Sequence, residues 1–350
     1  MRKRTYRKYT DIYAEFERFC REQISNHVFL VPPERTLTEQ FAASRMTIRK
    51  VLAEAEANGL IRRDGHQTHI LHARPLSACG RITYFVNGQE QIIMPPAFER
   101  LWLKLEPRLK SAAADFRLFQ VNHRTSFEEL KTAADESDVI LLAIIDCEPF
   151  LHYLQSIQEH KCVVALSDPY LEQFRNAVAL DNYAVGTAAA DTLWDAGCRK
   201  AAVCGGFDHP IFNKRRQGFA DRFQQYGGKI LSYPFPPGEI VRKIPACAAS
   251  LIDARERACD GIFILSDEWM DEITAPAYQL GGIPEQFRIL SFNGSGDWMR
   301  CSPAVSVLNS GTAEVVDTLM RYLEGSAVSG KFLPVRTLIK PHLYKNQTIG

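Results

Sequence analysis

Polar side chains follow several apolar runs in the second part of the chain, where each run ends. They are carboxylates and amides: Asp146, Asp168, Asp181, Asn182, Asp267 and Asn293. In open parallel sheets, ligands bind outside the carboxyl ends of the strands, among the residues that follow them. Carboxylates accept hydrogen bonds from hydroxyl groups, and an arginine such as Arg215 donates several. This set therefore suits a small polyhydroxylated molecule.

Aromatic side chains could complete such a pocket by packing on the apolar face of a sugar ring. Phe98, Trp269 and Trp298 are available for this role. Each polar residue has an alternative role as a helix cap, and each aromatic residue has one in the core. Our candidate ligand-binding residues are Phe98, Asp146, Arg215, Asp267, Trp269 and Asn293.

A second group of candidate binding residues lies near the N-terminus. Periodic apolar residues predict helices over about 10–24, 36–42 and 45–58, the last two joined by a short turn. The first turns of the third helix present Ser44, Arg45, Thr47 and Arg49, away from its apolar stripe. Arginine suits guanine edges and phosphates, and hydroxyl groups suit phosphate oxygens. The alternative is a solvated helix whose arginines pair with Glu54 or Glu56.

Two short strands follow the third helix. Residues 60–63 and 68–71 flank an Asp64-Gly65 turn, which is typical of a β-hairpin wing. Residues 1–72, called the head below, hold 13 Lys or Arg against 9 Asp or Glu, whereas the rest of the chain holds 29 against 32. A basic head on a slightly acidic body indicates that only the head binds a polyanion such as double-stranded DNA.

From residue 81 onward, in the part called the body (81–350), short apolar runs alternate with amphipathic helices. The predicted strands are 82–86, 116–121, 139–145, 162–167, 177–180, 201–204, 229–233, 261–265, 288–292 and 305–308. Continuous apolar runs such as Val139–Ile145 indicate parallel strands buried on both faces. Ten strands exceed one doubly wound sheet, so we expect two α/β lobes with a cleft between them. Residues 73–80 are the predicted linker.

The string VPPERTLTEQFAASRMTIRK and the hairpin after it resemble the winged helix-turn-helix of the GntR family of bacterial transcription regulators. The resemblance implies that Arg35 contacts the phosphate backbone and that residues 44–49 lie on the recognition helix. It also implies that Gly65, His66 and Gln67 form the tip of the wing. Gln67 stands where the family usually has glycine.

The body is similar to the LacI/GalR-type effector domain, which is akin to periplasmic sugar-binding proteins. The segments that carry this similarity include VALDNYAVGTAAADTLWDAGCRKAAVCGG, NKRRQGFADRFQQYGGKIL, CDGIFILSDEWM and LGGIPEQFRILSFNGSG. The resemblance implies that Arg215 and Asp267 bind the effector, while Asn293 replaces a usual aspartate. The expected fold class is therefore α/β, with a winged helix-turn-helix and a two-lobed parallel periplasmic-binding-protein-like domain, a combination found in arabinose-responsive repressors.

Other classes of protein fit less well. No apolar run is long enough to cross a bilayer and no signal peptide is evident, so we expect a cytoplasmic protein without a membrane partner. Nine scattered cysteines, never spaced CxxC, and isolated histidines predict no metal site and no cofactor. The nucleophile elbow, the P-loop and the HExxH motif are missing, so we do not expect an enzyme.

The sequence thus predicts a transcription regulator, with release of DNA on ligand binding as the commoner family behaviour. We expect a homodimer, associated through the body, that binds a pseudo-palindromic operator and responds to a sugar or related small polar molecule. The alternative is a carbohydrate-binding protein without sequence-specific DNA binding.

Overall fold

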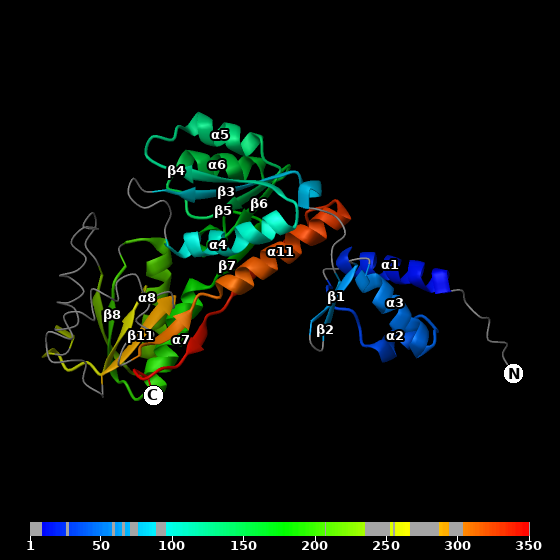
Figure 1. The fold of residues 1–350 in the computed structure, drawn as a ribbon. Coiled ribbons are helices and arrows are strands. Elements are labelled where there is room, and N and C mark those ends of the chain that lie inside the picture. The colour runs from blue at the N-terminus through cyan, green and yellow to red at the C-terminus, as the bar shows by residue number, and fades with distance from the viewer. Residues whose placement is uncertain are drawn as a thin grey trace.

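The computed structural model describes eleven segments of the chain. They are residues 9–25, 28–57, 60–64, 67–70, 76–88, 96–206, 208–234, 253–254, 256–266, 287–293 and 304–349. The described elements form a small head and two larger α/β lobes (Figure 1).

The head consists of three helices and a two-stranded antiparallel sheet. These are α1 (Tyr9–Ser25), α2 (Glu34–Gln40), α3 (Arg45–Ala57), β1 (Ile61–Asp64) and β2 (Gln67–Ile70). Their apolar faces meet in one core that contains Phe16, Leu37, Val51 and Ile61. All five expected elements are present, with ends within two residues of those predicted.

The first lobe is built on a six-stranded parallel sheet of order β13-β7-β6-β5-β3-β4. Its strands are β3 (Arg81–Asn87), β4 (Asp115–Val121), β5 (Val139–Leu142), β6 (Cys162–Ala165), β7 (Asn176–Leu180) and β13 (Arg336–Ile339). The helices α4 (Pro96–Ser111) and α11 (Thr312–Ser329) contribute to one core, and α5 (Phe127–Asp135) and α6 (Glu148–Ile157) contribute to a second. Both faces of the sheet are therefore buried, which explains the continuous apolar runs.

The second lobe repeats this plan. Its sheet has the order β14-β12-β11-β10-β8-β9, with strands β8 (Lys200–Cys204), β9 (Lys229–Tyr233), β10 (Gly261–Ile264), β11 (Arg288–Asn293), β12 (Ser306–Asn309) and β14 (His342–Tyr344). Only β14 runs antiparallel to its neighbour. The helices α7 (Asn182–Asp195) and α8 (Pro210–Gln225) pack on this sheet. Without the edge strands β13 and β14, both sheets have the doubly wound order 2-1-3-4-5.

The prediction of two parallel α/β lobes is confirmed, and all ten predicted strands occur. The run expected to extend to Ile145 ends as a strand at Leu142. Two further strands, β13 and β14, are not predicted from the sequence. Both lie at sheet edges, and their side chains alternate between exposed and partly buried, so they lack a continuous apolar run.

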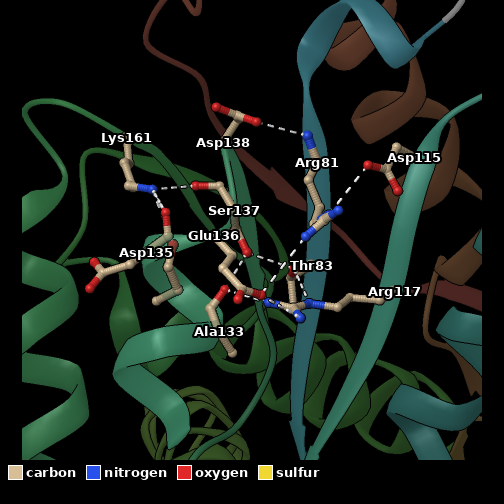
Figure 2. Close-up of polar contacts among 11 residues, drawn as sticks. Arg81, Thr83, Asp115, Arg117, Ala133, Asp135, Glu136, Ser137, Asp138 and Lys161 are labelled. Carbon is tan, nitrogen blue, oxygen red and sulfur yellow. Dashed lines mark hydrogen bonds and ion pairs between the residues drawn. The ribbon is translucent and has the colours of Figure 1, made fainter. Parts of the chain in front are cut away.

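Hydrogen bonds and ion pairs connect side chains and backbone carbonyl groups near the amino ends of the first-lobe strands (Figure 2). Arg117 of β4 donates from Nε to Thr83 Oγ1 at 3.0 Å and from Nη2 to the carbonyl oxygen of Ala133 at 2.7 Å. Its Nη1 donates to Glu136 Oε2 at 3.1 Å, and Arg81 Nη1 of β3 lies 3.8 Å from the same oxygen. The charged groups at this edge of the sheet are thus satisfied by one another.

Lys161 caps the C-terminal end of α5 in the same network (Figure 2). Its Nζ donates to the carbonyl oxygens of Ala134 at 3.2 Å and Ser137 at 2.6 Å, and also to that of Asp135. The last carbonyl groups of a helix have no partner within the helix, so a cation there supplies the missing hydrogen bonds. The polar groups at the amino edge of this sheet therefore have a structural role. We expect a ligand site at the opposite edge, where the carboxyl ends of the strands lie.

In the second lobe, α7 and α8 approach each other at two glycines. A methyl group at Gly186 of α7 would lie 2.1 Å from the carbonyl oxygen of Arg215, and one at Gly218 of α8 would lie 2.2 Å from that of Tyr183. These atoms belong to backbone, which cannot move aside as a flexible side chain can. The close crossing therefore requires glycine, and it fixes the position of the helix turn that carries Arg215.

Replacing Gly186 with alanine should destabilise the protein by about 3 kcal/mol, because the added methyl group forces the two helices apart. Gly227→Ala is the matched control, since no atom lies within 4 Å of its added methyl group and only its φ of +83° is unfavourable. The control should cost about 1 kcal/mol. Urea unfolding measures both. A G186A variant no less stable than the control would contradict the close-packing argument.

Candidate functional site

The third helix of the head has the geometry of a capped, exposed recognition helix. Ser44 Oγ accepts a hydrogen bond from the Thr47 backbone N–H at 3.1 Å, which satisfies one of the free donors of the first turn. Arg45, Met46 and Arg49 are exposed, and the Met46 side chain is 73% exposed. The predicted binding residues of α3 thus share one solvent-facing surface at its N-terminal end, where helix N–H groups favour anions.

Glu34 of α2 bridges the two arginines of that surface. Arg45 Nε lies 3.0 Å from Glu34 Oε2, and Arg49 Nε lies 3.0 and 3.2 Å from its two carboxylate oxygens. The hydrogen bonds from Arg45 and Arg49 hold the pKa of the Glu34 carboxyl below its ordinary value. The arginines therefore pair with Glu34 rather than with Glu54 or Glu56, the partners considered from sequence. No role for Glu34 is predicted from the sequence, although the residue lies within the PPERT string.

The other predicted head residues are more dispersed. Arg35, whose side chain is 92% exposed, pairs with Glu39 on the same helix at 3.5 Å. Gln67 is exposed at the start of β2. Gly65 and His66 lie outside the described residues. The wing strand β1 carries Arg62 and Arg63, both exposed.

A cleft between the two lobes gathers residues from both sheets at the carboxyl ends of their strands. The residues that line it are Ala97, Phe98, Leu101, Leu166, Ser167, Asp168, Leu180, Asn182, Ile211, Arg215, Phe292, Asn293, Ser310, Thr312 and Val315. This set is called the interlobe cleft below. The interlobe cleft is lined by apolar side chains and by a smaller number of polar ones, which is typical of a small-molecule site.

Arg215 is the basic residue that lines the cleft, and it is only 5% exposed. Its Nε donates to Asn182 Oδ1 at 2.7 Å, and its Nη1 donates to the carbonyl oxygen of Leu265 at 2.6 Å. The guanidinium carbon lies 4.0 Å from the centre of the Phe292 ring. Stacking and two hydrogen bonds hold the side chain in one orientation, as a bidentate donor requires.

Asp168, which follows β6, forms a buried network with Asn182. The Asn182 side chain donates to Asp168 Oδ1 at 2.8 Å, its backbone N–H donates to Oδ2 at 3.2 Å, and Lys214 Nζ lies 3.5 Å from Oδ2. Burial raises the pKa of Asp168, and the hydrogen bonds from Asn182 with the charges of Lys214 and Arg215 offset part of that rise. Asp168 and Asn182 were noted as strand-end residues from the sequence but not selected as site residues.

Two buried polar atoms of the cleft have no hydrogen-bond partner within the described part of the chain. They are Asn293 Oδ1 and Ser167 Oγ, on residues that are 5% and 3% exposed. The backbone of Asn293 has a φ of +101°, a conformation that asparagine tolerates better than most residues. An unpaired buried acceptor is costly unless another molecule supplies the hydrogen bond.

The remaining predicted ligand residues divide into three groups. Phe98 lines the cleft, together with Arg215 and Asn293. Asp146 is exposed and does not line it, and Asn87 Nδ2 donates to its carboxylate at 2.6 Å. Asp267 and Trp269 lie outside the described residues. Ser167, Ser310 and Thr312 also line the cleft, and only their places next to strand ends could have indicated it.

The described residues were searched for metal-ligand clusters and for membrane-spanning helices. Within them, no three His, Cys, Asp or Glu side chains are grouped as metal ligands would be. No described helix combines the length and apolar character that crossing a bilayer requires.

Two parts of the chain match known families. Residues 8–69 match the profile described as bacterial regulatory proteins of the gntR family, and residues 190–348 match the periplasmic binding protein-like domain. No match to the chain is found among curated proteins.

Solved structures of regulators resemble the fold. They include the transcription regulator GntR from Chromobacterium violaceum (18% identity, TM-score 0.60) and the Escherichia coli transcriptional repressor ascG (16%, 0.62). A third is a periplasmic binding protein/LacI transcriptional regulator from Alkaliphilus metalliredigens QYMF, complexed with D-xylulofuranose (20%, 0.59). Each comparison covers 77% of this chain and 98% of the other. At these identities the similarity establishes the fold.

The match of the head to gntR-family regulatory proteins, together with the binding-protein-like match of the body, identifies a DNA-binding transcription regulator. The chain combines a GntR-family DNA-binding domain with a periplasmic-binding-protein-like domain. Both resemblances found in the sequence are therefore confirmed.

Glu34→Gln should reduce discrimination between specific and random DNA about ten-fold, because the two arginines lose the charge that orients them. Binding to random duplex should not weaken, since the protein loses a negative charge. Glu39→Gln is the matched control, because it removes the same charge from α2 and leaves Arg45 and Arg49 paired. The measurement is the ratio of the Kd values for a selected genomic site and for a random duplex at one salt concentration. An unchanged ratio in E34Q would disprove the orienting role.

Proposed function

We propose that this regulator binds a sugar or related small polyhydroxylated molecule in the interlobe cleft, and that binding changes the affinity of the head for operator DNA. The observation that carries the proposal is the buried acceptor of Asn293, which has no partner among the described residues, in the same cleft as the oriented guanidinium of Arg215. The similar structure from Alkaliphilus metalliredigens is complexed with D-xylulofuranose, and one from Enterococcus faecium has bound ribose. Both support a ligand of the sugar class.

The chemistry of the cleft fits such a ligand. A ligand hydroxyl donates to Asn293 Oδ1, and the guanidinium of Arg215 donates to a ligand oxygen. The Phe98 ring covers the apolar face of the sugar. Because Asn293 is an amide where related proteins usually have a carboxylate, the ligand need not be a typical hexose. Asp267 and Trp269 are further proposed contacts.

The proposed DNA contacts belong to the head. Arg35 and Ser44 contact the phosphate backbone, Arg45, Thr47 and Arg49 enter the major groove, and Gly65, His66 and Gln67 carry the wing contact. The protein acts in the cytoplasm as a homodimer, without catalysis, on half-sites about one helical turn (roughly 34 Å) apart. Ligand binding releases the DNA, with a coupling free energy of about 1–3 kcal/mol.

Selection of bound sequences from fragmented genomic DNA tests this function, at a stated moderate salt concentration and with and without a panel of pentoses, hexoses and sugar acids. An enriched inverted repeat that a panel member depletes supports a ligand-released dimer. If no sequence is enriched under any condition, while a sugar still raises the melting temperature, the alternative of a carbohydrate-binding protein without specific DNA binding replaces the proposal.

Arg45→Ala and Arg49→Ala should each weaken binding to the selected operator by about 1–3 kcal/mol, because each removes a forked donor from the recognition surface. Arg35→Ala, at the proposed phosphate contact, should instead make the dependence of log K on log salt shallower by about one. Arg175→Ala, which removes an exposed arginine from the body, is the control. Fluorescence anisotropy over a salt series measures both quantities. Equal affinities of the head variants and the control would refute the recognition surface.

Arg215→Ala should abolish the response to the sugar while DNA affinity without the sugar stays within about two-fold, because the head is unchanged. Arg216→Ala is the matched control, since this neighbour donates to the carbonyl oxygens of Gly205 and Gly206 and does not line the cleft. Calorimetric titration gives the sugar affinity, and anisotropy gives the DNA affinity. An R215A protein with an unaltered sugar response would place the ligand elsewhere.

A further inference from the structure

The C-terminal half of α11 is a place where the head meets the body. The head helix α1 packs against α11, and Val328, in the last turn of α11, packs against the apolar core of the head. Figure 1 shows α11 running from the junction of the two lobes to the head. The contact therefore extends the core of the head onto a helix of the body.

Glu324 lies one turn before Val328, where charges of the head and of the body act on it. Burial raises the pKa of the Glu324 carboxyl, and the positive charges of Arg108, Arg321 and Arg62 act to lower it. Arg62 belongs to the wing strand β1, whereas Arg108 and Arg321 belong to the body. The head is thus held near α11 by an apolar contact and by attraction between opposite charges.

The covalent connection to the head is anchored on the same helix. The 3-10 turn η1 (Leu76–Cys79) packs against α11, and Cys79 Sγ donates to the carbonyl oxygen of Leu323 at 3.3 Å. Leu76 is fully buried in the core that α11 shares. A shift of α11 would therefore displace the chain connection and the docked face of the head together.

The other end of α11 lies in the cleft. Thr312 and Val315 line it, and Ser310 lines it immediately before the helix. The helix has 18 residues, which corresponds to about 27 Å. Leu319 and Leu323 are fully buried along its length, so its turns are fixed to one packed core. A continuous, packed helix is the kind of element that transmits a displacement without absorbing it.

We propose that α11 carries the ligand signal from the interlobe cleft directly to the head, as a rigid helix whose far end, around Glu324 and Val328, is the docking surface of the head. The inference rests on the proposed function, which supplies the ligand. The recognition surface stays open in the docked head, since Met46 is 73% exposed. Docking therefore sets the orientation of the head rather than covering its DNA-binding residues.

Docking is tested by hydrogen exchange of the full-length protein, measured by mass spectrometry. Val328→Asp should raise exchange of peptides from α1 about five-fold or more, because a charge replaces the apolar contact. Val328→Ala should act in the same direction, and it serves if V328D does not fold. Asp317→Asn is the matched control on the same helix, since Asp317 pairs with Arg108 at 2.8 Å and is exposed. If α1 peptides exchange hydrogen at the wild-type rate in both V328A and V328D, the proposed docking surface is wrong.

Transmission is tested by a change at the cleft end that needs no identified ligand. Val315→Phe adds volume between α11 and the cleft, and Val315→Ile is the milder form if it does not fold. Either change should alter α1 exchange at least about two-fold in the wild-type background and not in the V328A background. An equal effect in both backgrounds, or none in either, would overturn the route through α11. This experiment uses no sugar. If the cleft bound no sugar, the proposed function would be disproved, but the exchange result expected here would not change.

Discussion

The geometry of the cleft depends on three passages of the chain between the two lobes. The chain leaves the first lobe after β7, returns to it after β12, and leaves it again between β13 and β14. Hydrogen bonds and an ion pair connect these passages. The Asp181 N–H donates to the Ile339 carbonyl oxygen at 2.9 Å, and His342 Nε2 lies 2.9 Å from Glu314 Oε1. A few short, mutually bonded segments next to the cleft thus set the angle between two large rigid bodies, as in hinged binding proteins.

The two edges of the first-lobe sheet differ in how their polar groups are satisfied. At the amino edge, Arg117 and Lys161 find partners in neighbouring side chains and helix carbonyls. At the carboxyl edge, Ser167 Oγ and, from the second lobe, Asn293 Oδ1 have none among the described residues. Buried polar groups are normally paired, so unpaired groups gathered in a cleft support the proposed ligand site. In that proposal, stability and binding are separated along the strands.

In the head, one carboxylate pairs with two arginines of the proposed recognition surface. Glu34 holds Arg45 and Arg49 on the surface of α3, and all three side chains remain accessible to solvent. An exposed ion pair of this kind adds little stability, because water and salt screen it. In the proposed function, its effect is instead to limit the conformations of two long side chains before DNA binds. The body adds a second constraint, because α1 rests on α11.

The sequence by itself determined the elements and the class of fold. Apolar period, caps and turn residues act between near neighbours, so Ser44, the wing and the buried runs such as Val139–Leu142 could be predicted. Only the tertiary structure decided which polar residues meet. Asp146 and Asp168 both follow strands, yet only Asp168 lines the cleft, and Glu34 joins two arginines of the next helix. The edge strands β13 and β14 and the contact of α11 with the head were also beyond prediction. They depend on contacts between segments that are far apart in the chain. The local sequence of each segment does not indicate which distant segment it contacts.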